Sequence, residues 1–137
     1  MSYAIEDLRP GMSESLTRTV GDEDVTLFAK ISGDDNPVHF DEAFAKKTIF
    51  RGRVAHGMLP ATYISAVLGT RMPGPGTAFL SLTTRFKAPV RIGDAVTATC
   101  TVREVSGRRV LFDCVCTVKD KVVLEGEALV VPPAAKP

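Results

Sequence analysis

One short segment combines a carboxylate and an imidazole on a stretch of chain that cannot be helical. Residues 32–39 read Ser-Gly-Asp-Asp-Asn-Pro-Val-His, which places Asp34 and His39 on either side of Asn36-Pro37. A residue before proline is disfavoured in the α region, and proline has no N–H to give to a helix. The pattern therefore predicts a loop that holds Asp34 and His39 close enough to share one water molecule.

A second candidate group lies where a long apolar segment begins. Residues from Gly57 to about Thr70 are apolar on nearly all sides, which predicts a buried helix. Pro60 falls in its first turn, where the missing N–H costs no helical bond. The Gly57 N–H would then be unpaired at a helix N-terminus, favoured by the helix dipole and not shielded by a side chain. Such a donor beside an acid/base pair suits polarisation of a carbonyl while a water is activated.

Each candidate also has a purely structural interpretation. Asp34 could cap a turn with Asn36, as Asp and Asn side chains often do. His39 could be a buried structural histidine, and we expect His56 to orient the start of the helix, a direct role being the alternative. Ser65 lacks the Gly-x-Ser-x-Gly surroundings of a serine hydrolase nucleophile. The residues by themselves leave these alternatives open.

The composition is that of one globular domain over residues 1–137. Hydrophobic residues make up 45% and charged residues 24%, so the chain can bury a core. Seventeen basic and sixteen acidic residues give a net charge of +1 without a basic tract, which makes no case for nucleic acid or an anionic membrane as partner. The N-terminus does not resemble a signal peptide, and no apolar run could span a bilayer, so we expect a cytoplasmic protein.

The three cysteines are expected to be small core residues in a reducing compartment. They are Cys100, Cys114 and Cys116, all in strand-like segments. The alternative is a metal site built from Cys114, Cys116 and a histidine. Structural zinc normally has four ligands at recognisable spacing, and that set is not visible here, so no metal is expected.

The remaining elements must position the candidate loop and helix. Gly21-Asp22 predicts a helix start, with Gly33 as its C-cap, and a short helix over 41–47 is expected to be capped by Asp41 and packed by Phe44. Period-two alternation predicts an antiparallel sheet, with strands at 12–20, 79–86, 96–102, 110–118 and 122–131. The sheet can wrap the apolar helix, giving an α+β domain whose exposed edges would pair in a two-fold homodimer. Residues 132–137 are expected to be frayed.

Several segments together resemble a known family. Residues 28–41 (FAKISGDDNPVHFD) closely resemble the hydratase motif of the MaoC-like hot-dog family, with the best match to (R)-specific enoyl-CoA hydratases. Residues 54–59 (VAHGML) resemble the start of the family's central helix, and residues 86–94 (FKAPVRIGD) are similar to its turn between strands. The final Gly-Glu-Ala at 126–128 also matches.

The resemblance implies a hot-dog fold, a homodimer and reversible hydration of a trans-2-enoyl-CoA to the (R)-3-hydroxyacyl-CoA. It implies that Asp34 and His39 are the catalytic pair and that the Gly57 N–H binds the thioester carbonyl. It implies neither a metal nor a redox cofactor, because CoA arrives as part of the substrate. The residues that it places against the substrate are Asn36, Ser65, Leu68 and Val130.

Other functions remain as alternatives on this fold. One is a 3-hydroxyacyl thioester dehydratase acting on carrier-protein substrates, and another is a thioesterase. A different class is a non-catalytic acyl-CoA-binding module. The Asp34/His39 pair argues against the last two, because binding alone does not need an acid/base pair on one loop.

Overall fold

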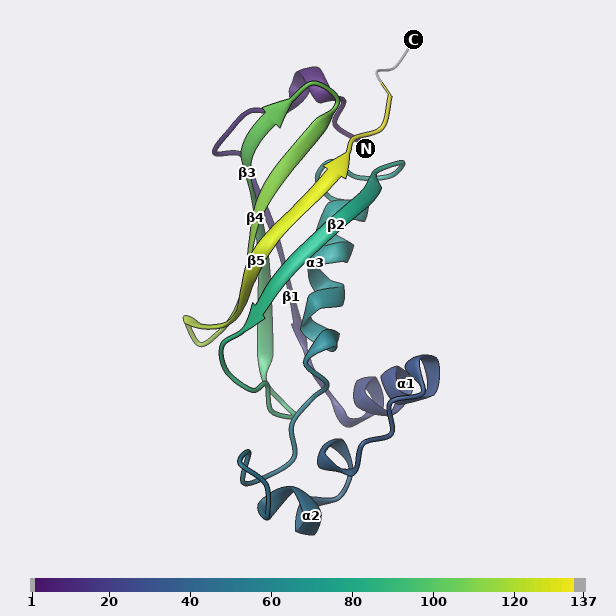
Figure 1. Cartoon of the computed structure of the whole chain (residues 1–137), viewed down its shortest axis with the longest axis vertical. Coiled ribbons are helices and arrows are strands. Elements are labelled where there is room, and N and C mark those ends of the chain that lie inside the picture. Colours follow the sequence, from purple (N-terminus) through teal and green to yellow (C-terminus); the bar gives the residue numbers. More distant parts are fainter. Residues whose placement is uncertain (1, 135–137) are drawn as a thin grey trace.

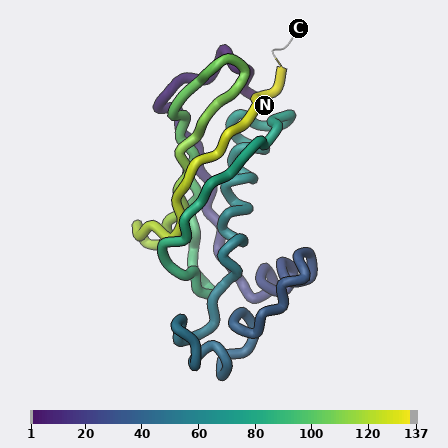
Figure 2. The backbone as a smooth tube through the Cα atoms, viewed as in Figure 1, coloured from purple at the N-terminus to yellow at the C-terminus, as the bar shows by residue number. Residues whose placement is uncertain are grey.

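A five-stranded antiparallel sheet lies along one long helix in the computed structural model, which describes residues 2–134 (Figure 1). Two further helices lie beyond the end of the sheet, as Figure 2 also shows. The α+β architecture with a sheet against a central helix is therefore as expected. In chain order the elements are the 3-10 helix η1 (Ile5–Asp7), β1 (Ser13–Thr19), α1 (Asp22–Ser32), the 3-10 helix η2 (Pro37–His39), α2 (Glu42–Lys46), α3 (Met58–Thr70), β2 (Ala78–Phe86), β3 (Ala95–Ser106), β4 (Arg109–Val118) and β5 (Lys121–Val131).

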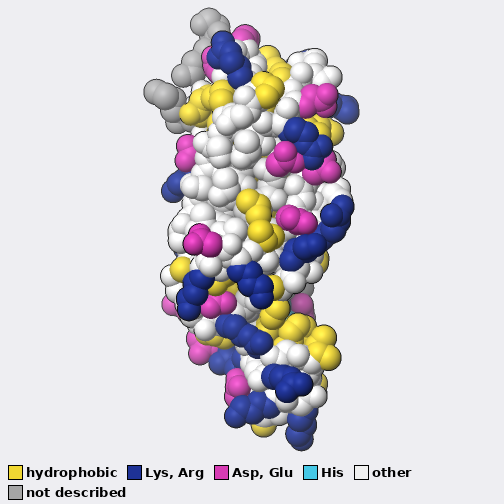
Figure 3. Space-filling view, turned by 90° about the vertical axis from the view of Figure 1, so that its left-hand side faces the viewer, with side chains coloured by type: hydrophobic (Ala, Val, Ile, Leu, Met, Phe, Trp, Pro, Cys, Tyr) yellow, Lys and Arg dark blue, Asp and Glu magenta, His cyan; other side chains and the backbone are white. Residues whose placement is uncertain are grey.

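The strand order β1-β3-β4-β5-β2 leaves β1 and β2 at the two edges. Alternate residues of the central strands are buried, as the period-two pattern predicts; they include Val96, Cys100, Val110 and Phe112. The opposite face of the sheet carries charged side chains of both signs (Figure 3). The sheet therefore has one core face and one solvated face.

The three cysteines are confirmed as buried core residues. Cys100 and Cys114 are partners across β3 and β4, and Cys116 Sγ lies 3.6 Å from the Pro60 carbonyl oxygen at the start of α3. Burial raises the pKa of the Cys116 thiol to about 12, and the neighbouring Cys114 thiol together with burial raises the pKa of Cys100. These thiols are thus protonated and poorly nucleophilic at neutral pH.

Helix α3 begins where the sequence predicts, with Gly57 as its N-cap and Pro60 within the first turn. It packs against β1, β3 and β4. Its buried residues include Ile64, Val67 and Leu68, none of which has any exposed surface. This burial anchors the helix, and so the position of Gly57 relative to the sheet is set by core packing.

Helices α1 and α2 carry the loop that contains the candidate residues. Gly33 ends α1 in the left-handed conformation (φ +81°), and the Asp41 carboxylate caps α2 by accepting a hydrogen bond from the Phe44 N–H at 3.0 Å. The expectation that Phe44 packs α2 is wrong, because this residue is 45% exposed. Ala45 faces the interior instead, in a small cluster with Val38 and Val54, since a five-residue helix turns only a narrow side inward.

The chain remains packed beyond the last strand. Pro132 is buried, and a Cβ placed at Gly76 would lie 2.9 Å from the Pro133 Cβ, so the expected fraying does not begin at Pro132. Residues 135–137 of the expected frayed tail lie outside the described residues. None of the helices within residues 2–134 combines the length and the apolar character of a membrane-spanning helix.

Candidate active site

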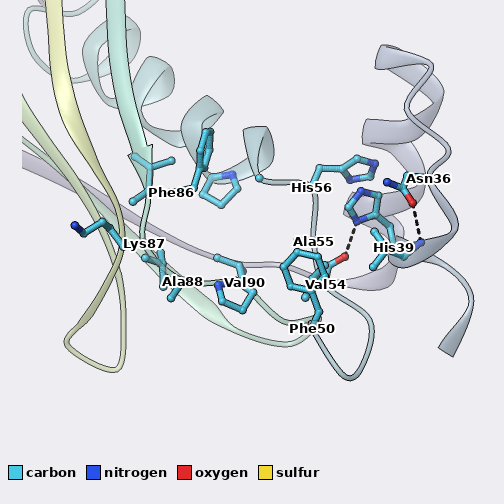
Figure 4. A pocket seen from close by; sticks show the side chains of 16 residues that line it. Asn36, His39, Phe50, Val54, Ala55, His56, Phe86, Lys87, Ala88 and Val90 are labelled. Atoms are coloured by element: carbon cyan, nitrogen blue, oxygen red, sulfur yellow. Dashed lines mark hydrogen bonds between the residues drawn. The ribbon is translucent and has the colours of Figure 1, made fainter. Parts of the chain in front are cut away.

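His39 is buried at the end of η2, where a hydrogen bond from its ring fixes its position. Its Nδ1 donates a hydrogen bond to the Val54 carbonyl oxygen at 2.7 Å (Figure 4). A carbonyl can only accept, so Nδ1 carries the hydrogen and Nε2 presents a lone pair in the neutral ring. The sequence-predicted loop therefore delivers an imidazole whose tautomer is determined by a backbone contact.

Asp34 lies at the exposed end of the same loop. One of its carboxylate oxygens accepts a hydrogen bond from the Asn36 N–H at 3.3 Å, which is the turn-capping contact expected of an Asx residue. The Asn36 side chain in turn caps η2 by accepting from the Val38 N–H at 3.1 Å. The contact with the Asn36 N–H leaves the second carboxylate oxygen of Asp34 with lone pairs that can accept other hydrogen bonds.

His56 lies directly against His39. The two rings are stacked with centroids 3.8 Å apart, and the Phe28 ring lies 4.7 Å from His56 (Figure 4 shows the two histidines). His56 Nε2 donates to the Asp34 carbonyl oxygen at 2.9 Å. Within residues 2–134, the His56 Nδ1 is the buried side-chain nitrogen or oxygen that lacks a hydrogen-bond partner. His56 therefore tethers the Asp34 backbone and confines the His39 ring.

The three side chains converge on one point. A carboxylate oxygen of Asp34 and one ring nitrogen each of His39 and His56 all lie within 4.8 Å of one another. Polar atoms separated by more than about 3.5 Å can be joined by a single water. The spacing of the three groups suits a single bridging water.

Electrostatics favour the neutral form of His39. Burial lowers the pKa of the His39 imidazole below its ordinary 6.5; the hydrogen bond to Val54 opposes this, His56 lowers the pKa further and the Asp34 carboxylate raises it. Desolvation is the largest cause, because a buried imidazole loses the hydration that stabilises its charge. At neutral pH the ring can therefore accept a proton at Nε2.

A cavity of about 470 Å³ opens beside His39 and Gly57 (Figure 4). The Gly57 N–H has no hydrogen-bond partner among the described residues, as expected at a helix N-terminus. A Cβ at Gly57 would lie 3.4 Å from two carbons of the Phe86 ring, so a side chain there would press on the cavity wall. Besides the predicted Asn36, His39 and Gly57, the lining includes Val54, Ala55, Pro60, Phe86, Lys87, Ala88, Val90, Val123 and Leu124.

The other residues expected to contact substrate lie elsewhere. Ser65 is exposed on α3 and does not line this cavity. Leu68 and Val130 have no exposed surface and pack in the main core. Asp34 also lies outside the lining, although a carboxylate oxygen of Asp34 lies within 4.8 Å of ring nitrogens of the lining residues His39 and His56. The assignment of Ser65, Leu68 and Val130 to the substrate remains a prediction.

Sequence reasoning did not foresee two features of the site. It expected His56 to orient the helix start, but not its stacking on His39. It also did not foresee that Arg53 would bind the His39 backbone, its Nε donating to the His39 carbonyl oxygen at 2.8 Å. Both contacts join segments that are distant in sequence, and the only local signal was their place beside the apolar helix.

Comparison with known proteins identifies the family of the chain. The family model described as MaoC like domain matches residues 8–126. An (R)-specific enoyl-CoA hydratase of Rhodospirillum rubrum is 53% identical over 134 residues, covering 96% of this chain and 93% of that protein. A 3-hydroxybutyryl-CoA dehydratase of Methylorubrum extorquens is 51% identical over 127 residues, covering 91% of this chain and 81% of that protein.

A solved structure extends the similarity to three dimensions. The unliganded R-hydratase PhaJ1 from Pseudomonas aeruginosa superimposes with a TM-score of 0.92 at 38% identity, covering 98% of this chain and 88% of that chain. The antiparallel sheet along a central helix is thus the expected hot-dog fold. Because the family model matches most of its length, the chain belongs to the MaoC-like family.

Proposed function

We propose that this protein is an (R)-specific enoyl-CoA hydratase, which adds water reversibly to a trans-2-enoyl-CoA. The observation that carries the proposal is the convergence of the Asp34 carboxylate and the His39 imidazole within 4.8 Å of each other, next to the cavity that Gly57 lines. The names of the similar proteins from Rhodospirillum rubrum and Pseudomonas aeruginosa support the same activity.

The proposed reaction uses one water held between Asp34 and His39. The water oxygen forms a bond to Cβ of the enoyl thioester while the pair takes one of its protons. The electron pair of the double bond moves toward the thioester oxygen, and the Gly57 N–H stabilises the negative charge that develops there. The pair then returns a proton to Cα, so that one water has been added and the enzyme is unchanged. The reaction is redox-neutral, and we propose that it needs neither a metal nor an electron carrier.

The contacts of the two side chains suit these roles. Because Nδ1 of His39 is bonded to Val54, Nε2 is the atom free to bind water, and the lowered pKa keeps it able to accept a proton. Asp34 is an acceptor for the same water through the oxygen that the Asn36 N–H does not use. The two groups form one coupled unit, so the base and acid roles belong to the pair.

Hydration of crotonyl-CoA tests the proposal. Loss of the enoyl absorbance without release of free thiol is the expected result, and chiral analysis of the product should find the (R)-alcohol. Thiol release would mean a thioesterase, and neither signal would mean a binding module; either result contradicts the proposal.

A second candidate is the dehydratase direction, with either CoA or carrier-protein thioesters as substrates. The similarity to the 3-hydroxybutyryl-CoA dehydratase favours the same chemistry run backwards, because hydration and dehydration share one transition state. Comparing kcat/KM for crotonyl-CoA and for crotonyl-carrier protein decides the substrate, and we expect CoA to be preferred.

We also propose that the chain forms a homodimer through β2 and α3. The edge strand β2 exposes Phe79, Leu80 and Phe86, whereas the other edge strand, β1, exposes mainly Ser, Thr and charged residues. On α3, Met58 and Ser65 lie on the exposed side. An apolar edge of this kind favours pairing with a second copy. Light scattering should give the mass of a dimer, and Leu80→Glu should shift it toward the monomer; a monomeric wild type would contradict the proposal.

A further inference from the structure

Two consecutive residues, Arg53 and Val54, hold His39 from both sides. The Val54 carbonyl oxygen accepts from the His39 ring at 2.7 Å, and Arg53 Nε donates to the His39 backbone carbonyl oxygen at 2.8 Å. The Val54 N–H also bonds to the Val38 carbonyl oxygen at 3.3 Å. The ring and the backbone of the proposed catalytic histidine are therefore fixed by the same short segment.

Arg53 is itself anchored at several points. Its Nη2 lies 2.5 Å from the Asp22 carboxylate in the first turn of α1, and this hydrogen bond lowers the pKa of the Asp22 carboxyl. The Arg53 N–H donates to Glu42 of α2 at 3.3 Å. The Arg91 guanidinium binds the carbonyl oxygens of Phe50 and Gly52 at 2.6 and 3.2 Å, which fixes the loop before Arg53. The guanidinium of Arg53 thus connects α1 to His39.

We propose that Arg53 is a positioning residue, which sets the direction of the His39 ring through its bond to the His39 carbonyl oxygen. This inference rests on the proposed hydratase function. A rotation of the His39 backbone would swing Nε2 away from the water that it shares with Asp34, and a misplacement of about 1 Å can cost about 100-fold in rate. Asp22 binds the Nη2 end of the Arg53 guanidinium, so its effect on the position of His39 acts through Arg53.

The competing role for Arg53 is direct contact with CoA phosphate. Arg51, Arg53 and Arg91 line a second, smaller pocket of about 350 Å³, which a phosphate could enter. The structure argues against this role, because Arg53 and Arg91 already bind protein acceptors. The two roles differ in one measurable respect: positioning affects every thioester equally, whereas a phosphate contact affects only substrates that carry the phosphates.

The experiment compares crotonyl-CoA with crotonyl-N-acetylcysteamine, which has no phosphates. Arg53→Met removes both side-chain bonds, and we expect kcat to fall by about 10- to 100-fold with both thioesters, with KM changed little. Arg53→Lys, which keeps the charge and a donor nitrogen, should recover part of the loss. Asp22→Asn should lower kcat no more than about fivefold, because an exposed ion pair couples weakly. Arg103→Met is the matched control: its ion pairs with Asp113 and Glu127 join neighbouring strands β3, β4 and β5 and do not contact His39.

A second readout does not depend on turnover. Ring ¹⁵N shifts of His39 report its tautomer, and Arg53→Met should weaken the preference for hydrogen on Nδ1 while Arg103→Met leaves it unchanged. Unchanged rates and shifts would overturn the inference, and so would a loss confined to the CoA thioester. If Arg53→Met does not fold, Arg53→Lys carries the same comparison. A wild type without hydratase activity would contradict the proposed function instead, so the two failures are distinguishable.

Discussion

Two substitutions of His39 can separate its chemistry from its structural contact. The amide nitrogen of Asn occupies roughly the place of Nδ1, so His39→Asn can keep the donor to the Val54 carbonyl oxygen while removing Nε2. The amide of Gln lies near the place of Nε2, so His39→Gln keeps a polar group toward the cavity but gives up the bond to Val54. Comparing the two variants therefore separates the acid–base role of Nε2 from the structural role of Nδ1.

The expected magnitudes follow from these contacts. General acid–base groups typically contribute 10²–10⁴ in rate, or about 3–5 kcal/mol of transition-state stabilisation, and both variants lose it because neither amide titrates. His39→Gln also leaves the Val54 carbonyl oxygen without its partner, at a cost of about 1–3 kcal/mol in the free energy of unfolding. We therefore expect both variants to be slow, and His39→Gln to be the less stable by about 1–3 kcal/mol.

Initial rates with crotonyl-CoA and urea unfolding of each variant measure the two effects. Arg103→Met serves as the control again, because its ion pairs with Asp113 and Glu127 lie in the sheet and it does not line the cavity. A rate within tenfold of wild type in either His39 variant would refute the acid/base role. If the Asn and Gln variants are equally stable, the hydrogen bond from the His39 ring to the Val54 carbonyl oxygen does not contribute the expected stability.

Three further outcomes are expected. Asp34→Asn should slow hydration by about 10²–10⁴ with an unfolding midpoint close to wild type, because the amide oxygen can still accept from the Asn36 N–H; a fast enzyme, or one that unfolds early, would contradict this. Gly126→Ala should prevent folding or greatly lower the melting temperature, since the new Cβ would lie 1.8 Å from the Thr83 carbonyl oxygen, and a wild-type melting temperature would mean that β2 and β5 can separate. The pKa of His39 is lower in the folded protein than in the unfolded chain, so the neutral ring contributes fully to stability above pH 6.5, and this contribution is lost as pH falls through the folded pKa. The wild type should therefore lose more of its free energy of unfolding than His39→Asn between pH 8 and pH 5. Equal pH dependence of the two proteins would contradict this prediction.

Local sequence rules predicted those parts of the site that depend on neighbouring residues. Asn36-Pro37 excludes a helix and so predicts the loop, and Gly33 can adopt the positive φ that ends α1. The all-round apolar character of residues 57–70 predicts the buried helix and hence an unpaired N–H at Gly57. The alternating strands likewise predicted the sheet, because a strand with one buried face alternates in polarity.

Contacts between distant segments could not be read from the chain. The same loop rules would be satisfied whether His56 stacked on His39 or pointed elsewhere, and Arg53 is an ordinary surface arginine until folding brings the His39 carbonyl oxygen to it. By itself, the sequence determined which groups can do chemistry and which backbone they lie on. Only the tertiary structure decided how they are aimed, because direction depends on packing between residues that no local pattern connects.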